Sequence, residues 1–99
     1  PDRPTAIFAG SDLQAMGVYE AARQHRLRIP EDLSVVGFDD VQTSAFLGPP
    51  LTTVLQPLQE MAEAATQLLI DANTQNLGER HIVMPTSLVV RNSTAPPHA

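Results

Sequence analysis

The chain has 99 residues, of which 42% are hydrophobic and 17% charged, a globular composition with room for one domain at most. Eleven acidic residues stand against six arginines and no lysine, and the net charge of −5 argues against direct contact between these residues and nucleic-acid phosphates. The absence of cysteine excludes disulfides and thiolate chemistry, and no apolar run approaches the ~18 residues of a membrane span.

The first predicted elements are a strand and a helix. Residues 5–9 form a short apolar run, which predicts a strand buried on both faces. Ser11 and Asp12 are favoured helix N-caps, so a helix is predicted over residues 13–26. The apolar residues of this helix recur three and four positions apart and form one stripe: Ala15, Val18, Tyr19 and Ala22.

The middle of the chain is predicted to be largely extended. A second buried strand over residues 34–38 ends at Asp39 and Asp40. The pattern at residues 43–46 predicts a helical turn. Residues 51–55 are rich in Thr and Val, which favours a third strand.

The second half contains the clearest helix, which is predicted to begin after Pro57. Its apolar stripe consists of Leu58, Met61, Ala62, Ala65, Leu68, Leu69 and Ala72. Residues 80–84 and 87–90 predict two further strands, and the tail over residues 93–99 is predicted to be loosely held and to supply no core residue. The order strand, helix, strand, strand, helix, strand indicates an α/β fold with a mostly parallel sheet and flanking helices.

Polar side chains follow two of the predicted strands, at the edge where ligands bind in open α/β sheets. Ser11 and Asp12 come after the first strand, and Asp39 and Asp40 come after the second. Carboxylates suit a polyhydroxylated ligand, because each offers two acceptor oxygens to neighbouring hydroxyl groups. Other interpretations stay open: Asp12 as a helix cap only, Asp39 and Asp40 as solvated loop acids, a pair between one of them and Arg91, or a magnesium site.

No catalytic constellation accompanies these acids. The sequence contains no GxSxG elbow, P-loop or metalloprotease histidine pair, and its three histidines are too scattered to predict a metal site. A hydrolase that used Asp39 and Asp40 would lack a nucleophile and a positioned base. We therefore predict a protein that is not an enzyme and that uses no metal or cofactor.

Four segments in one unbroken register carry a family resemblance: PTAIFAGSD at 4–12, RIPEDLSVVGFDD at 28–40, PLTTV with Gln56 and Pro57 behind it at 50–57, and LVVRNST at 88–94. Together they resemble the lactose-repressor/galactose-repressor (LacI/GalR) family of bacterial transcription factors. The resemblance implies a fragment, the C-terminal part of a two-lobed effector-binding domain with a type I periplasmic-binding-protein-like fold. It also implies that the N-terminal helix-turn-helix DNA-binding domain of the family is absent from this chain.

In that family the chain crosses between the two lobes three times, and the resemblance divides this chain accordingly. Residues 1–55 would be part of the C-terminal lobe. Residues 56–85, a helix and a strand, would cross to the N-terminal lobe. Residues 86–99 would return as a strand and tail.

The resemblance also implies a set of ligand-binding residues. Asp39, the first acid of the GFDD motif, matches a residue that binds effector hydroxyls. Ser11 and Asp12 match the usual Asn-Asp pair of the family, whose first member often contacts the ligand, so Ser11 supplies a hydroxyl where the family has an amide. Gln56 matches a position that faces the cleft.

A second set of residues would form a dimer interface. Leu13 and Met16 lie off the apolar stripe of the first helix, either as single exposed apolar residues or as part of a second contact surface. Together with Phe46 and Leu47 they match the side-by-side dimer face of the family. The implied protein is a cytoplasmic homodimer that binds a small-molecule effector, a sugar. It would contact operator DNA only through the absent helix-turn-helix domain, and it would have no membrane partner.

A fragment of a periplasmic or secreted sugar-binding protein of ABC transport is the alternative, because such proteins have a similar two-lobed fold. The upstream sequence would separate the two, since a transport protein begins with a signal peptide and a regulator with a helix-turn-helix. The residues of the dimer face favour the regulator, because transport binding proteins usually act as monomers.

Overall fold

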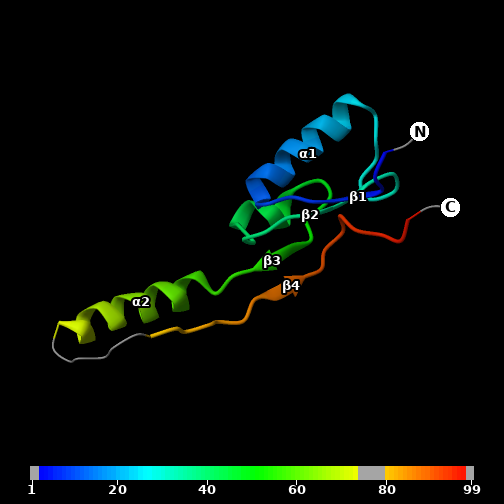
Figure 1. Cartoon of the computed structure of the whole chain (residues 1–99). Helices are drawn as coiled ribbons and strands as arrows, with labels where there is room; N and C mark the ends of the chain where they lie inside the picture. The colour runs from blue at the N-terminus through cyan, green and yellow to red at the C-terminus, as the bar shows by residue number, and fades with distance from the viewer. Residues whose placement is uncertain (1–2, 74–79, 98–99) are drawn as a thin grey trace. The chain divides into compact units, whose positions relative to one another are not determined.

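The structure, a computed structural model, describes residues 3–73 and 80–97 (Figure 1). The elements follow in the order β1 (Ala6–Phe8), α1 (Asp12–Gln24), β2 (Ser34–Val36), the 3-10 helix η1 (Gln42–Phe46), β3 (Thr53–Leu55), α2 (Leu58–Ala72) and β4 (Ser87–Val89). They divide into two compact units. Unit 1 comprises Pro1–Leu55 and Ser87–Ala99, and unit 2 comprises Gln56–Thr86.

Unit 1 is built on a largely parallel sheet. β1 pairs with β2 in parallel, with Ile7 opposite Val35. β3 continues the parallel order through isolated bridges, one of which joins Val36 to Thr52, and β4 runs antiparallel beside β3. α1 packs against β2. This arrangement confirms the predicted α/β fold with a mostly parallel sheet.

The cap and the stripe of α1 lie where the sequence predicts them. Ser11 is the N-cap, and its Oγ accepts a hydrogen bond of 3.1 Å from the Gln14 N–H. The helix ends at Gln24, two residues earlier than predicted, and Arg26 adopts the left-handed conformation common beyond helix ends. The stripe faces the buried core, which consists of Ala9, Ala15, Ala22, Leu33, Val35 and Leu51.

The strand predicted to be buried on both faces is covered on only one. Ile7 packs against the core, whereas Phe8 is 66% exposed. Successive side chains of a strand point to opposite faces, and α1 covers one face only. Phe8 therefore lies on the face of the sheet that is largely exposed in the described residues.

The prediction of a loosely held tail is wrong for its first residues. Ser93 is fully buried. Its Oγ donates to the Val35 carbonyl at 2.5 Å and accepts from the Thr52 N–H at 2.8 Å, so it joins β2 to the segment before β3. The Ala95 N–H donates to Ser34 Oγ at 3.0 Å. The tail therefore adds a polar layer to the sheet of unit 1.

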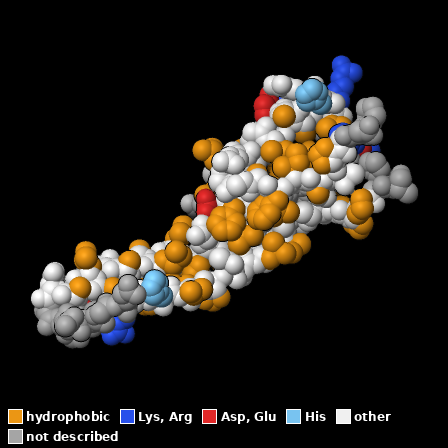
Figure 2. All heavy atoms as spheres, in the orientation of Figure 1, with side chains coloured by type: hydrophobic (Ala, Val, Ile, Leu, Met, Phe, Trp, Pro, Cys, Tyr) orange, Lys and Arg blue, Asp and Glu red, His pale blue; other side chains and the backbone are white. Residues whose placement is uncertain are grey.

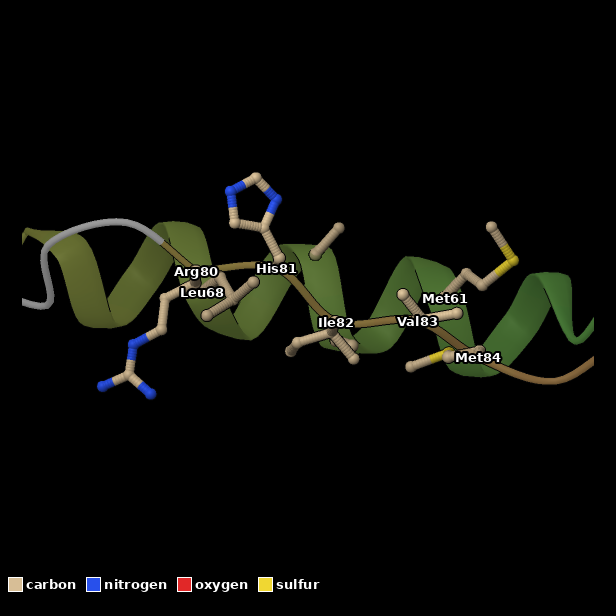
Figure 3. A pocket seen from close by; sticks show the side chains of 9 residues that line it. Met61, Leu68, Arg80, His81, Ile82, Val83 and Met84 are labelled. Carbon is tan, nitrogen blue, oxygen red and sulfur yellow. The ribbon is translucent and has the colours of Figure 1, made fainter.

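Unit 2 contains α2, which begins after Pro57 as predicted and has no buried residue. The strand predicted over residues 80–84 does not form, because a strand needs a hydrogen-bonded partner and the described part of unit 2 offers none. Figure 3 shows this segment running alongside α2. The helix and the segment line a groove of about 410 Å³ formed by Met61, Ala64, Ala65, Leu68, Arg80, His81, Ile82, Val83 and Met84.

Large apolar side chains also remain at the surface of unit 1. Leu13 is 76% exposed and Phe46 is 81% exposed, and Figure 2 shows several apolar patches on the face that it presents. Within residues 3–73 and 80–97, neither helix has the length and apolar character needed to cross a membrane.

Candidate ligand-binding site

The parallel strands of unit 1 bring two predicted ligand residues to one edge of the sheet. Ser11 directly precedes α1 at the end of β1, and Asp39 lies beyond β2. The Asp12 N–H donates to the Phe38 carbonyl at 2.9 Å, which ties the start of α1 to the end of β2. Ser11 and Asp39 are both half-buried. The carboxyl ends of neighbouring parallel strands thus form one polar edge, where ligands bind in this class of sheet.

The backbone at this edge makes an unusual turn. Asp39 has φ 118° and Asp40 has φ 54°, two consecutive residues in a region that L-amino acids rarely adopt. Such conformations cost on the order of 1–3 kcal/mol each unless the surroundings hold them. The Asp39 N–H donates to the Val54 carbonyl at 2.9 Å, and the Asp40 N–H donates to Thr53 Oγ1 at 3.3 Å. Both acceptors belong to β3, so this strand fixes the backbone of the turn.

An ion pair fixes the second residue of the turn. The Arg91 guanidinium donates to a carboxylate oxygen of Asp40 at 2.8 Å, and the two side chains are only 20% and 18% exposed. A second guanidinium nitrogen donates to the Leu51 carbonyl at 2.9 Å. Of the open interpretations of the two adjacent acids, the pairing with Arg91 is confirmed for Asp40.

Asp12 lies at the centre of a buried hydrogen-bond network. Its side chain is fully buried. One carboxylate oxygen accepts from the Val41 N–H at 2.8 Å and from Ser44 Oγ, and the other accepts from Thr53 Oγ1 at 2.6 Å. The cap belongs to Ser11, so Asp12 is not the N-cap. A direct ligand contact does not fit Asp12 either, because both of its oxygens already face protein donors.

Gly37 permits the close approach of Asp12 to β2. A Cβ at this position would overlap the Asp12 carboxylate and lie 2.8 Å from Leu51 Cδ2. Any larger residue would push the start of α1 away from the sheet. Asp12, Ser44 and Thr53 come from three separate segments, so the local sequence around Asp12 gives no signal of the network.

Gln56 occupies a different position from the other predicted ligand residues. It is the first residue of unit 2 and follows Leu55 at the end of β3. Leu55 itself forms a parallel bridge with Asp39. The Gln56 side chain is half-buried. Its role stays a prediction of the resemblance.

The four residues of the predicted dimer face lie on two neighbouring segments. Leu13 is in the first turn of α1, Phe46 is the last residue of η1, and both are largely exposed. Met16 is half-buried, and Leu47 packs against the core. The network of Asp12 joins the start of α1 to η1. The exposed part of the predicted face is therefore Leu13 and Phe46.

Two surface pairs of arginine and carboxylate are separate from this edge. On α1, the hydrogen bond and charge of Arg23 hold the pKa of Glu20 at about 2. Arg28 in the same way holds the pKa of Asp32 well below its usual range.

Burial raises the pKa of Tyr19, whose hydroxyl donates to the Pro49 carbonyl at 2.7 Å. In the described residues, no three His, Cys, Asp or Glu side chains gather where they could hold a metal ion.

Comparison with known proteins gives a consistent result. The family model described as "Periplasmic binding protein-like domain" matches residues 1–94. The ribose operon repressor of Escherichia coli (strain K12) is 39% identical over 95 residues, which are 96% of this chain and 29% of that protein. The HTH-type transcriptional repressor CytR of the same strain is 41% identical over 95 residues, 95% of this chain and 28% of that protein. The chain thus spans less than a third of the length of these relatives.

Solved structures with the same fold include two of particular relevance. A LacI family transcriptional regulator from Enterococcus faecium with bound ribose superposes with a TM-score of 0.88 at 32% identity, over 96% of this chain and 36% of the other. The lac repressor dimer bound to operator and the anti-inducer ONPF superposes with a TM-score of 0.88 at 32% identity, over 94% of this chain and 32% of the other. Both of these proteins are transcriptional regulators.

Proposed function

Because this chain belongs to the family of periplasmic binding protein-like domains, we propose that it is the C-terminal part of the effector-sensing and dimerisation domain of a LacI/GalR-type transcriptional regulator. The similarity to two repressors over nearly the whole chain supports this proposal. The relatives in these comparisons are transcriptional regulators, and the proposed role of this chain is likewise binding without catalysis.

The effector in this proposal is a small polyhydroxylated molecule, a sugar. The observation that carries the proposal is the position of Asp39, half-buried at the carboxyl edge of the parallel sheet and fixed by its bond to β3. An ionised carboxylate there can accept from two adjacent hydroxyl groups. A relative of the same fold that binds ribose supports this class of ligand.

The remaining predicted residues take distinct roles in this proposal. Ser11 offers its hydroxyl as a second contact beside Asp39, and Gln56 contributes from the crossover after β3. Asp12 holds the loop that follows Asp39 and makes no direct contact. Residues 1–55 and 86–99 belong to one lobe, and residues 56–85 belong to the other.

Regulation then follows from a population shift. A bound effector favours one conformation of the effector domain, and a homodimer passes that conformation to DNA-binding domains outside this chain. The face carrying Leu13, Met16, Phe46 and Leu47 joins the two copies. The regulator acts on operator DNA in the cytoplasm.

The test is a ligand-induced thermal shift of the full-length protein with a panel of sugars that includes ribose. A ligand at about 100 times its dissociation constant adds ~2.7 kcal/mol of stability and raises the melting temperature measurably. Asp39→Asn keeps the shape of the side chain but removes its charge, so the affinity should fall at least tenfold. The matched control is Glu31→Gln, an exposed acid outside the site. An unchanged shift in Asp39→Asn would show that Asp39 is not a ligand residue.

A second measurement tests the class of protein. The gene upstream of Pro1 should encode a helix-turn-helix. A signal peptide at that place would instead assign the chain to a secreted sugar-binding protein.

A further inference from the structure

We infer that Arg91 is a positioning residue of the proposed effector site, which it serves through Asp40 and without touching the effector. The inference rests on the proposed function, because it concerns the geometry of the turn that carries Asp39. It assigns a role to a side chain that lies 51 residues away from Asp40 in the sequence.

The first step concerns where Arg91 is anchored. Its backbone N–H donates to Thr52 Oγ1 at 2.9 Å, and its guanidinium donates to the Leu51 carbonyl at 2.9 Å. Thr52 and Leu51 precede β3 and are buried. The arginine is thus hydrogen-bonded to two buried residues in addition to its contact with the turn.

The second step concerns what Arg91 holds. The guanidinium extends from the end of the β4 segment to the Asp40 carboxylate at 2.8 Å, and both side chains are about four-fifths shielded from water. Charge-assisted hydrogen bonds of this kind are roughly twice as strong as neutral ones, and salt screens them less when they are shielded. By contrast, the pair formed by Arg23 and Glu20 on α1 is 72% and 53% exposed.

The third step links Asp40 to Asp39. The two residues share a peptide bond and both have positive φ, so the direction of the Asp39 side chain depends on the conformation of Asp40. A backbone in this region returns to more populated conformations when the groups that hold it are removed. Once the Arg91 side chain is removed, Asp40 is held by the 3.3 Å hydrogen bond from its own N–H to Thr53 Oγ1.

A merely structural role would predict a different result from a positioning role. Loss of a structural contact lowers the stability of the whole domain, and amide exchange then rises everywhere. Loss of a positioning contact loosens the turn locally and weakens effector binding while the rest of the sheet stays protected. Hydrogen exchange distinguishes the two, and it needs no knowledge of the effector.

The experiment compares Arg91→Gln with Arg23→Gln in the full-length protein. In Arg91→Gln, amide exchange over residues 38–46 should accelerate at least tenfold, while residues 6–24 keep their protection. In Arg23→Gln neither segment should change. Equal acceleration throughout the protein, or no acceleration at 38–46, would overturn the inference.

The binding measurement uses ribose as the probe, with Asp40→Asn and the double variant alongside. Each single variant should weaken ribose binding about tenfold, and the double variant should be no weaker than either, because both remove the same contact. Additive losses would mean that Arg91 and Asp40 act independently, which contradicts the inference. If Asp39→Asn binds ribose like the wild type while Arg91→Gln still loosens residues 38–46, the proposed site fails and the positioning role stands.

Discussion

Replacing Asp12 with alanine is the most demanding test of how unit 1 is held together. The carboxylate is fully buried and accepts hydrogen bonds from the Val41 N–H, Ser44 Oγ and Thr53 Oγ1. Asp12→Ala deletes this acceptor and leaves three buried donors facing a small cavity. The loop from Val41 to Ser44 loses its main attachment to α1.

The magnitude follows from the number of donors. A buried donor left without a partner costs about 1–3 kcal/mol. The two hydroxyls can rotate toward other acceptors, but the Val41 N–H cannot, so we expect a loss of about 3–5 kcal/mol in the free energy of unfolding. For a domain of the size proposed, that loss lowers the melting temperature by roughly 6–20 °C. Asp12→Asn keeps the shape and one acceptor oxygen, so its cost should be intermediate.

Urea unfolding of the full-length protein measures this loss. The matched control is Glu31→Ala, an exposed acid whose removal should leave the unfolding midpoint unchanged. If Asp12→Ala lowers the free energy of unfolding by less than about 1 kcal/mol, the three donors do not depend on this carboxylate and the reasoning is refuted. A slope of unfolding that differs between variants would instead indicate a changed denatured or native state.

Three further predictions concern other positions. Gly37→Ala should destabilise the protein by about 1–3 kcal/mol in urea unfolding, because its Cβ would overlap the Asp12 carboxylate; full stability would contradict the packing described. Ser93→Ala should cost about 1–3 kcal/mol in the same assay, because two buried backbone groups lose their partner, and a neutral result would mean that the tail is not attached. The pKa of Glu20 is held at about 2, below its ordinary value of 4.5, so its contribution to stability is complete above pH 4.5 and is lost as the pH falls toward 2. By NMR titration, Arg23→Gln should return that pKa toward 4.5, and an unmoved pKa would exclude Arg23 as the cause.

Local patterns were sufficient to predict the helices. The N-cap at Ser11 and the apolar stripe that includes Ala15 and Ala22 specify α1, since both depend on residues less than two turns apart. Pro57 and the periodic stripe behind it likewise specify the start of α2. These signals require no knowledge of the rest of the chain.

The strands and the tail are harder to predict from local sequence, because their structure depends on partners far away in the chain. Residues 80–84 have the composition of a strand but no described partner, so they remain extended without a ladder. Ser93 lies beside prolines and next to the chain end, which indicates disorder by composition alone. Its burial depends on Val35 and Thr52, 58 and 41 residues earlier in the chain.

The three acids at the strand ends illustrate why a candidate site can be located from sequence before its residues can be assigned. Asp12, Asp39 and Asp40 are alike in local sequence, since each follows an apolar strand. Tertiary contacts give them different roles: the lack of a side chain at Gly37 leaves room for the buried Asp12 carboxylate, and Asp40 forms an ion pair with Arg91. Gly37 is distant from Asp12 in the sequence, and Arg91 is 51 residues from Asp40, so the sequence next to each acid does not predict its contact. The topology of parallel strands predicts the edge, whereas the contacts that fix Asp12 and Asp40 come from other segments and are seen only in the folded chain.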